Sequence, residues 1–302
     1  GFIPAMAAYV IVFALVDSFT FGQAYSWFNA KLTNYEKIEC RVAPYVIQVT
    51  LAPLAEVMFV LYLWRKKGIS PSHSLSSALW TVLTDFASVF TVMTFALIYN
   101  LKTGLVPALN IWWLLVVIIF WIGYFVNLIF WHSPLKPKVA AWIERSQQLG
   151  KEEQGFKKVL LMISGQLIQL LKTFSLGKWY HYLWVYGLRM TVLAFSLFSN
   201  FMALRAVGIK VPIPLAAVGI PIIVMSVFLP ISVGGFGGTQ GLAILFFTVI
   251  GGVLKEQVMA YSFLWSTAFV IGRFLVGMIF IRGFWKSTFP EGFRTWRKAK
   301  TN

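Results

Sequence analysis

The residues best suited to chemistry in this sequence are charged side chains that fall inside long apolar stretches. Glu56 and Asp85 are acids of this kind, and Arg273 is a base that could face them. A charge at the bilayer centre costs roughly 2.5 kcal/mol or more, so each needs a partner, the protein interior or water. Two interpretations stay open, a proton or headgroup site and a set of structural ion pairs. Asp17 and Arg189 are expected nearer an interface, with their charges extended toward the headgroups.

A glycine-rich stretch, PISVGGFGGTQG at 230–241, is the second candidate. Proline removes a backbone donor and glycine lowers helix propensity, so the chain is expected to unwind here. Unwound backbone inside a membrane must be satisfied by protein or water, which predicts a cavity; close helix packing is the alternative. Free amides before a helix that starts near Gln240 would suit an anion or a headgroup. The candidate residues are Pro230, Ser232, Gly234, Gly235, Gly237, Gly238, Thr239 and Gln240.

Other chemistry has little support in the sequence. Cys40 is the single cysteine, which excludes an intrachain disulfide, and the three histidines show no metal-ligand spacing. Motifs of nucleophilic, nucleotide-binding and zinc enzymes are absent. No cofactor and no metal site are therefore expected.

Composition indicates where these residues lie. The 302 residues are 59% hydrophobic and 12% charged, with a mean hydropathy of +0.76. Stretches of about twenty apolar residues are long enough to cross roughly 30 Å of hydrocarbon as helices. We expect an all-α integral membrane protein, one polytopic domain over 1–302, with the first segment a genuine span and not a signal peptide. About eight transmembrane helices are predicted, at 2–28, 43–64, 78–100, 110–131, 181–204, 213–229, 240–254 and 257–281.

The distribution of basic residues predicts the orientation. The 65–77 and 132–180 connections and the C-terminal tail share one side in this topology and hold 17 Lys and Arg, against 7 on the other side. The richer side, with the C-terminus, is predicted to be cytoplasmic. The 132–180 segment mixes apolar and basic residues, as interfacial helices do. The net charge of +16 is expected to favour contact with anionic lipid headgroups and not binding of nucleic acid.

Two distant segments share a layout. Glu56 precedes Gly68 by 12 residues and a tryptophan by 24, whereas Gln240 precedes Gly252 by 12 and a tryptophan by 25. Elements at about 43–100 and 213–281 would run in opposite directions, which predicts an inverted repeat with two broken or re-entrant elements, as in many transporters. Chance similarity between apolar segments is the alternative. Whether 213–254 is two spans or a re-entrant pair stays open.

The glycine-rich stretch, the earlier Pro53-Leu-Ala-Glu56 and the segment NFMALRAVGIKVPIP at 200–214 together resemble the family named for the transmembrane region of lysylphosphatidylglycerol synthetases. The likeness covers roughly 40–285. This chain has Gln240 where the family often has Glu, Leu54 and Ala55 where Gly is common, and Thr81-Val82 in place of a frequent Glu-Arg pair. A role that needs two symmetric acids would then fall to Glu56 alone.

The resemblance implies lipid handling. We expect a lipid transporter or flippase, and not an enzyme, that moves an anionic, aminoacylated, glycosylated or polyprenyl-linked lipid across the cytoplasmic membrane. The alternative is a membrane-embedded subunit of a lipid-modifying transferase, with Glu56 or Asp85 as a base. The expected partners are membrane lipids and, in the alternative, a transferase.

Overall fold

Five long apolar helices form the frame of the molecule. The computed structural model describes residues 1–49, 52–132, 141, 172–226 and 236–289, and all regular elements of this part are helices. Within these described residues, five helices are long and apolar enough to cross a membrane: α1 (Phe2–Phe28), α5 (Pro71–Thr103), α6 (Ile111–His132), α9 (Trp179–Ala206) and α12 (Lys255–Thr288). The chain is accordingly a multi-pass membrane protein, as its composition predicts.

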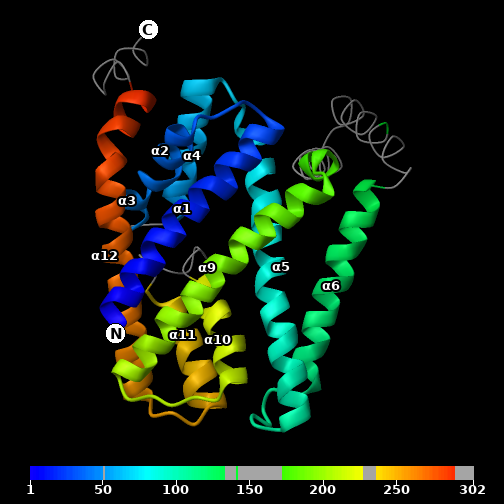
Figure 1. Ribbon diagram of the computed structural model, residues 1–302, viewed down its shortest axis with the longest axis vertical. Helices are drawn as coiled ribbons and strands as arrows, with labels where there is room; N and C mark the ends of the chain where they lie inside the picture. The colour runs from blue at the N-terminus through cyan, green and yellow to red at the C-terminus, as the bar shows by residue number, and fades with distance from the viewer. Residues whose placement is uncertain (50–51, 133–140, 142–171, 227–235, 290–302) are drawn as a thin grey trace, which may run out of the picture.

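The long helices alternate in direction between two ends of the molecule. In Figure 1 the connections 104–110, 207–212 and 251–254 lie at the lower end, and the end of α12 lies at the upper end. Helices α1, α6 and α12 run upward, whereas α5 and α9 run downward. Helix α6 stands to one side, against α5 and the short η1 (Lys172–Leu176).

Local signals set the ends of α5. Ser70 caps its first turn by accepting a hydrogen bond from the His73 N–H, and proline follows at the first helical position. The helix ends at Gly104, whose φ of 64° is the left-handed conformation that glycine adopts without strain. The buried Asn100 side chain then bonds the backbone of Val106 and Leu109, which closes the lower turn.

A first helical hairpin enters from the upper end and returns to it. It consists of α2 (Asn34–Val42), α3 (Tyr45–Gln48) and α4 (Ala52–Lys67), and we call it hairpin 1. A reciprocal capping box between Thr33 and Glu36 starts α2. Lys67 at the end of α4 lies 2.9 Å from Glu36, so both arms of the hairpin meet at the upper end.

A second hairpin enters from the lower end. Hairpin 2 consists of α10 (Ile213–Met225), α11 (Gly238–Ala243) and the π-helix η3 (Ile244–Ile250). The described helical residues of the two arms, 213–225 and 238–250, number 13 each, about 20 Å of helix. The arms pack through glycine: a Cβ on Gly251 would lie 2.7 Å from Leu215, and one on Gly219 would lie 3.0 Å from Phe246.

Three of the eight predicted spans fall in the two hairpins. The predicted span at 43–64 is not confirmed as one continuous helix, because the structure divides it between α3 and α4. The predicted spans at 213–229 and 240–254 correspond, in the described residues, to the shorter apolar helices of hairpin 2, 213–225 and 238–250. The other five predicted spans are confirmed as long helices. Most of the expected interfacial segment at 132–180 lies outside the described residues.

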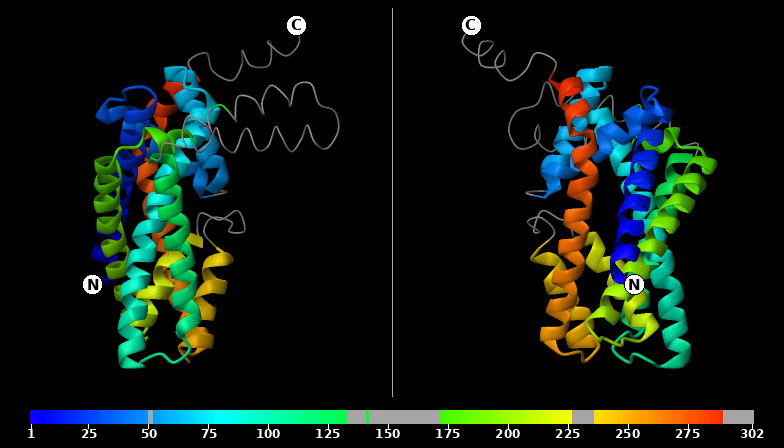
Figure 2. Two further views of the ribbon diagram at one scale, coloured as in Figure 1. Left: turned by 90° about the vertical axis from the view of Figure 1, so that its right-hand side faces the viewer. Right: turned by 60° about the vertical axis from the view of Figure 1, so that its left-hand side comes forward.

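Both hairpins lie beside α12, hairpin 1 toward the upper end and hairpin 2 toward the lower end (Figure 1 and Figure 2). Helix α12 contacts α2, α3 and α4 of hairpin 1 and α11 and η3 of hairpin 2. The main apolar core joins α1, α9, α10 and α12, with Tyr9 stacked on Phe269 at 5.4 Å between ring centroids. The fold therefore brings polar residues from distant parts of the sequence together inside the helix bundle.

Candidate functional site

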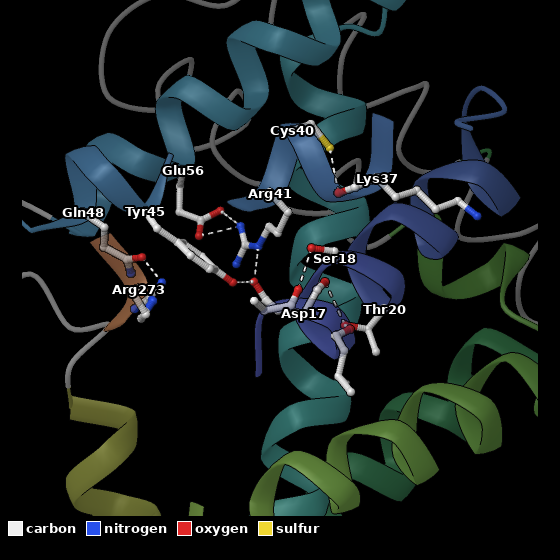
Figure 3. A network of polar contacts seen from close by, with 12 residues as sticks. Asp17, Ser18, Thr20, Lys37, Cys40, Arg41, Tyr45, Gln48, Glu56 and Arg273 are labelled. Carbon is white, nitrogen blue, oxygen red and sulfur yellow. Dashed lines mark hydrogen bonds and ion pairs between the residues drawn. The ribbon is translucent and has the colours of Figure 1, made fainter. Parts of the chain in front are cut away.

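Asp17 is the centre of a buried charge network between α1 and hairpin 1. Its Oδ2 accepts hydrogen bonds from Arg41 Nε at 2.6 Å and from the Tyr45 hydroxyl at 2.8 Å (Figure 3). Its Oδ1 accepts from Arg189 Nη2 at 3.1 Å. Three donors thus satisfy a carboxylate whose side chain is only 3% exposed.

Arg41 carries the network outward to hairpin 1's second arm. Its Nη1 donates to both carboxylate oxygens of Glu56, each at 2.8 Å. The guanidinium carbon lies 3.9 Å from the Phe21 ring centroid and 5.3 Å from that of Phe59, distances typical of cation–π contacts. Arg41 is consequently fixed by two acids and two aromatic rings.

Arg189 extends the network in the other direction, since its Nε lies 2.7 Å from Asp85 Oδ1. Acids and bases therefore alternate along one path, which we call the charge chain: Glu56, Arg41, Asp17, Arg189 and Asp85. Its members come from α4, α2, α1, α9 and α5. Three acids against two bases give it an excess of one negative charge when all are ionised.

The charge chain lies deep between the two ends of the helices. Asp17 is about 22 Å along α1 from its first residue and about 16 Å from its last. Asp85 is about 21 Å from the start of α5, and Arg189 about 15 Å from the start of α9. In a bilayer of about 30 Å these positions are within the hydrocarbon layer, where charges are costly unless paired.

The charge chain is buried in its middle, partly buried at Asp85 and most exposed at Glu56. Side-chain exposure is 3% for Asp17, 10% for Arg41 and 6% for Arg189, but 42% for Glu56 and 24% for Asp85. Next to Glu56, the apolar side chains of Leu54 and Val57 are also exposed on α4. A carboxylate thus reaches the surface of the helix bundle beside an apolar face, a geometry that suits an amphipathic ligand.

The structure places Arg273 differently from the sequence hypothesis. Its Nη2 bonds Gln48 Oε1, and its guanidinium carbon lies 4.0 Å from the Tyr45 ring centroid (Figure 3). Among the described residues, no hydrogen bond or ion pair joins Arg273 to Glu56 or Asp85. Tyr45 links Arg273 to the charge chain, because the same tyrosine donates its hydroxyl proton to Asp17.

Only part of the glycine-rich candidate lies in the described residues; Pro230, Ser232, Gly234 and Gly235 do not. Gly237 has a φ of 95°, and its N–H donates to Gln240 Oε1 at 2.6 Å. Gln240 thereby caps the start of α11, where Gly238 is the first residue. Thr239 is buried, with its hydroxyl 3.4 Å from that of Ser226.

Sequence reasoning missed the centre of the network. The expectation that Asp17 and Arg189 extend toward an interface is wrong, because both are buried and bond each other. The predicted topology puts Arg41 in the connection before the span at 43–64. The nearby Pro44 and Pro53 indicate an interruption of the helix, but the sequence alone does not show that the segment carrying Arg41 folds back into the helix bundle.

The arrangement can bind a charged or polar headgroup and can hold protons on carboxylates. In the part of the chain that the structure describes, no three His, Cys, Asp or Glu side chains come together as a metal site requires. Cys40 is buried and donates to the Lys37 carbonyl oxygen, 3.4 Å away, so it is not placed as an open nucleophile.

Comparison with known proteins agrees with the resemblance found in the sequence. No curated protein and no solved structure matches the chain. Residues 45–277 match the family model described as the lysylphosphatidylglycerol synthase TM region. This match covers hairpin 1 from α3 onward, hairpin 2 and all but the end of α12, which is more than half of the chain. The protein belongs to the family of the lysylphosphatidylglycerol synthase transmembrane region.

Proposed function

We propose that this protein is a lipid transporter that moves a lipid with an anionic, aminoacylated, glycosylated or polyprenyl-linked headgroup between leaflets. The observation that carries the proposal is the charge chain, which lies at the depth of the hydrocarbon layer and opens at Glu56 beside an exposed apolar face of α4. A headgroup could bind the polar end there while its acyl chains stay along the helix surface. Membership in a family of lipid-handling membrane regions supports this reading.

The order of elements supports an inverted repeat as the transport architecture. One unit is α1, hairpin 1 and α5; the other is α9, hairpin 2 and α12. The units run in opposite directions, and their hairpins enter from opposite ends (Figure 1). Trp80 in α5 and Trp265 in α12, which the repeated sequence layout aligns, are both fully buried. In transporters such repeats place the substrate site where broken helices meet near the midplane.

Alternating access would follow from movement of one unit against the other. The Asp17–Arg189 bond joins the two units, and α12 contacts both hairpins. A small rotation could open the Glu56 end of the site toward one leaflet or the other while the buried middle of the charge chain stays paired. Inverted repeats produce such exchange because their two conformations are related by symmetry.

The orientation that we propose puts the upper end in the cytoplasm, in the cytoplasmic membrane. Basic residues at upper helix ends are Arg65, Lys66, Lys67, Lys178 and Lys286, whereas those at lower ends are Lys102, Arg205 and Lys255. Cytoplasmic ends of membrane helices carry the excess of Lys and Arg. The end of α12 and the C-terminal side of the chain would then be cytoplasmic.

Reconstitution tests the proposal directly. The purified protein is placed in liposomes with one fluorescent lipid at a time: phosphatidylglycerol, an aminoacylated phosphatidylglycerol, a glycolipid or a polyprenyl phosphate. A membrane-impermeant quencher then reports the label in the outer leaflet. We expect at least one lipid to exchange leaflets faster than in protein-free liposomes, with or without a proton gradient. Rates equal to those of protein-free liposomes for every lipid and both conditions would refute transport.

A second function, a membrane subunit of a lipid-modifying transferase, is favoured by one observation: the charge chain ends in a carboxylate, Glu56, whose side chain is 42% exposed. An open carboxylate can act as a general base on a lipid hydroxyl. This reading predicts that the pure protein, or its complex with a co-purifying transferase, converts a labelled lipid, and that Glu56→Gln or Asp85→Asn abolishes conversion. Leaflet exchange without any chemical change would decide against it.

A further inference from the structure

We infer that Arg41 binds the phosphate of a lipid headgroup and that Glu56 occupies the same guanidinium group when no lipid is bound. The inference deepens the proposed function, on which it rests for the lipid nature of the ligand. It names the group that would recognise the substrate, and it gives Glu56 the role of an internal competitor and not of a substrate ligand.

Arg41 is already positioned for an anion. Asp17 holds its Nε, and the Phe21 ring lies against its guanidinium group. Nη1 faces Glu56, while Nη2 makes no hydrogen bond to any residue in the described part of the chain. The pair of Nη donors is the side of the guanidinium that matches two phosphate oxygens in a bidentate contact.

Glu56 is the replaceable partner of Arg41. Its hydrogen bonds in the described residues go to Arg41 Nη1 alone, and its side chain is the most exposed of the charge chain, at 42%. Asp17, in contrast, is buried and bonds three donors. A ligand that displaces Glu56 therefore breaks one partly exposed ion pair, whereas displacing Asp17 would dismantle the network.

Charge favours exchange over simple addition. A phosphodiester and a carboxylate each carry one negative charge, so replacing one by the other leaves the net charge around Arg41 unchanged. If Glu56 stayed in place, the phosphate would lie beside a second negative charge. The charge chain already carries one more acid than bases, so this repulsion would be unfavourable at low dielectric constant.

The surroundings favour a lipid phosphate over a free one. Glu56 is about 16 Å from the end of α4 by helical rise, and Val57 beside it is 60% exposed. Apolar surface at this depth faces acyl chains in a bilayer, and a free phosphate would gain nothing from it. A headgroup bound at Arg41 would have its chains next to this surface.

Binding to the full-length protein in detergent tests the inference by calorimetry. The probes are dihexanoyl phosphatidylglycerol, inorganic phosphate, and dihexanoylglycerol, which lacks the phosphate. We expect Glu56→Gln to bind the lipid phosphate about tenfold more tightly than the unmodified protein, since the neutral amide competes less for Arg41. The matched control, Glu36→Gln, removes a negative charge from the same hairpin away from Arg41 and should change affinity less than twofold.

Three results would overturn the exchange: equal or weaker binding by Glu56→Gln, an equal gain in Glu36→Gln, or equal binding of dihexanoylglycerol. Tighter binding of inorganic phosphate than of the lipid would overturn the lipid assignment.

Arg41→Lys should bind the lipid phosphate more weakly than the unmodified protein. Its thermal unfolding transition is measured as well, to separate lost binding from lost folding. The comparison of Glu56→Gln with Glu36→Gln does not depend on the Arg41→Lys variant. Failure of leaflet exchange with the tenfold gain intact would refute transport while leaving the competition at Arg41 standing.

Discussion

Asp17 Oδ1 lies 3.1 Å from Arg189 Nη2, across 172 positions of sequence. This bond joins α1 to α9, while the other oxygen of the same carboxylate bonds Arg41 and Tyr45 of hairpin 1. One side chain thus connects two long helices and hairpin 1. Because it lies in the apolar part of the molecule, its bonds are poorly replaced by water.

Asp17→Asn should destabilise the protein by about 3 kcal/mol or more. The change leaves two buried arginines without their shared counter-charge, and breaking a buried ion pair from one side is strongly destabilising. The measurement is the thermal unfolding midpoint in detergent. Glu256→Gln, which removes an exposed acid at the start of α12, serves as the control and should unfold at the unmodified midpoint. Equal midpoints for both variants would contradict the central role of Asp17.

Acid should weaken the upper end of hairpin 1 through Glu36. Burial favours its neutral form, but the bonds from Lys67 and from the Thr33 backbone N–H, together with the nearby Lys66, prevail and lower the pKa of Glu36 below 4.5. A carboxyl with a lowered folded-state pKa adds stability above its unfolded pKa. That stability is lost as the pH falls through the folded-state pKa.

We therefore expect the unfolding midpoint of the unmodified protein to fall as the pH drops below about 4.5. Glu36→Gln should show a lower midpoint at neutral pH and a shallower loss on acidification. The same pH series on Glu256→Gln controls for other carboxylates. An acid response in Glu36→Gln as steep as in the unmodified protein would assign the acid sensitivity to other groups.

Gly251→Ala should destabilise hairpin 2, by about 1–3 kcal/mol. A Cβ there would lie 2.7 Å from Leu215 and 2.8 Å from the Phe247 carbonyl oxygen, so the arms must separate. Gly241→Ala is the matched control, because nothing lies within 4 Å of its Cβ position and it is exposed in α11. Alanine should be neutral or slightly stabilising there, since it is the better helix former. Unfolding midpoints of the two variants in detergent measure the difference, and a smaller loss for Gly251→Ala than for Gly241→Ala would contradict the close packing.

The sequence predicts the helical membrane class and the family, because both depend on local composition and on short motifs. It also predicts an irregular element next to Gln240, where Gly237 has a positive φ. The hairpins are harder to predict. A run such as 43–64 is long and apolar enough to span, whereas the structure divides it between α3 and α4 of hairpin 1, both of which pack against α12.

The partners of the charges could not be predicted for the same reason. Glu56 and Asp85 were recognised as intramembrane acids from their positions alone, but which arginine each one faces depends on how hairpin 1 inserts among the long helices. Arg41 falls in the arm that the apolar pattern assigns to a connection, and hairpin 1 carries it to Asp17 and Glu56. Long-range contacts of this kind have no periodic signature in the sequence.

Lys31 distinguishes the proposed topology, in which hairpin 1 turns back, from eight full spans. It lies exposed in the connection between α1 and hairpin 1, at the same end as the α4–α5 connection that follows Arg65. With eight spans, Lys31 and Arg65 would be on opposite sides of the membrane.

In a Cys40→Ala background, single cysteines at 31, 65 and 102 are treated in intact cells with a membrane-impermeant thiol reagent. We expect Lys31→Cys and Arg65→Cys to react only after the membrane is permeabilised, whereas Lys102→Cys, at the opposite end of α5, reacts in intact cells. Reaction of Lys31→Cys together with Lys102→Cys, and not with Arg65→Cys, would show that the segment after α1 crosses the membrane and that hairpin 1 does not turn back.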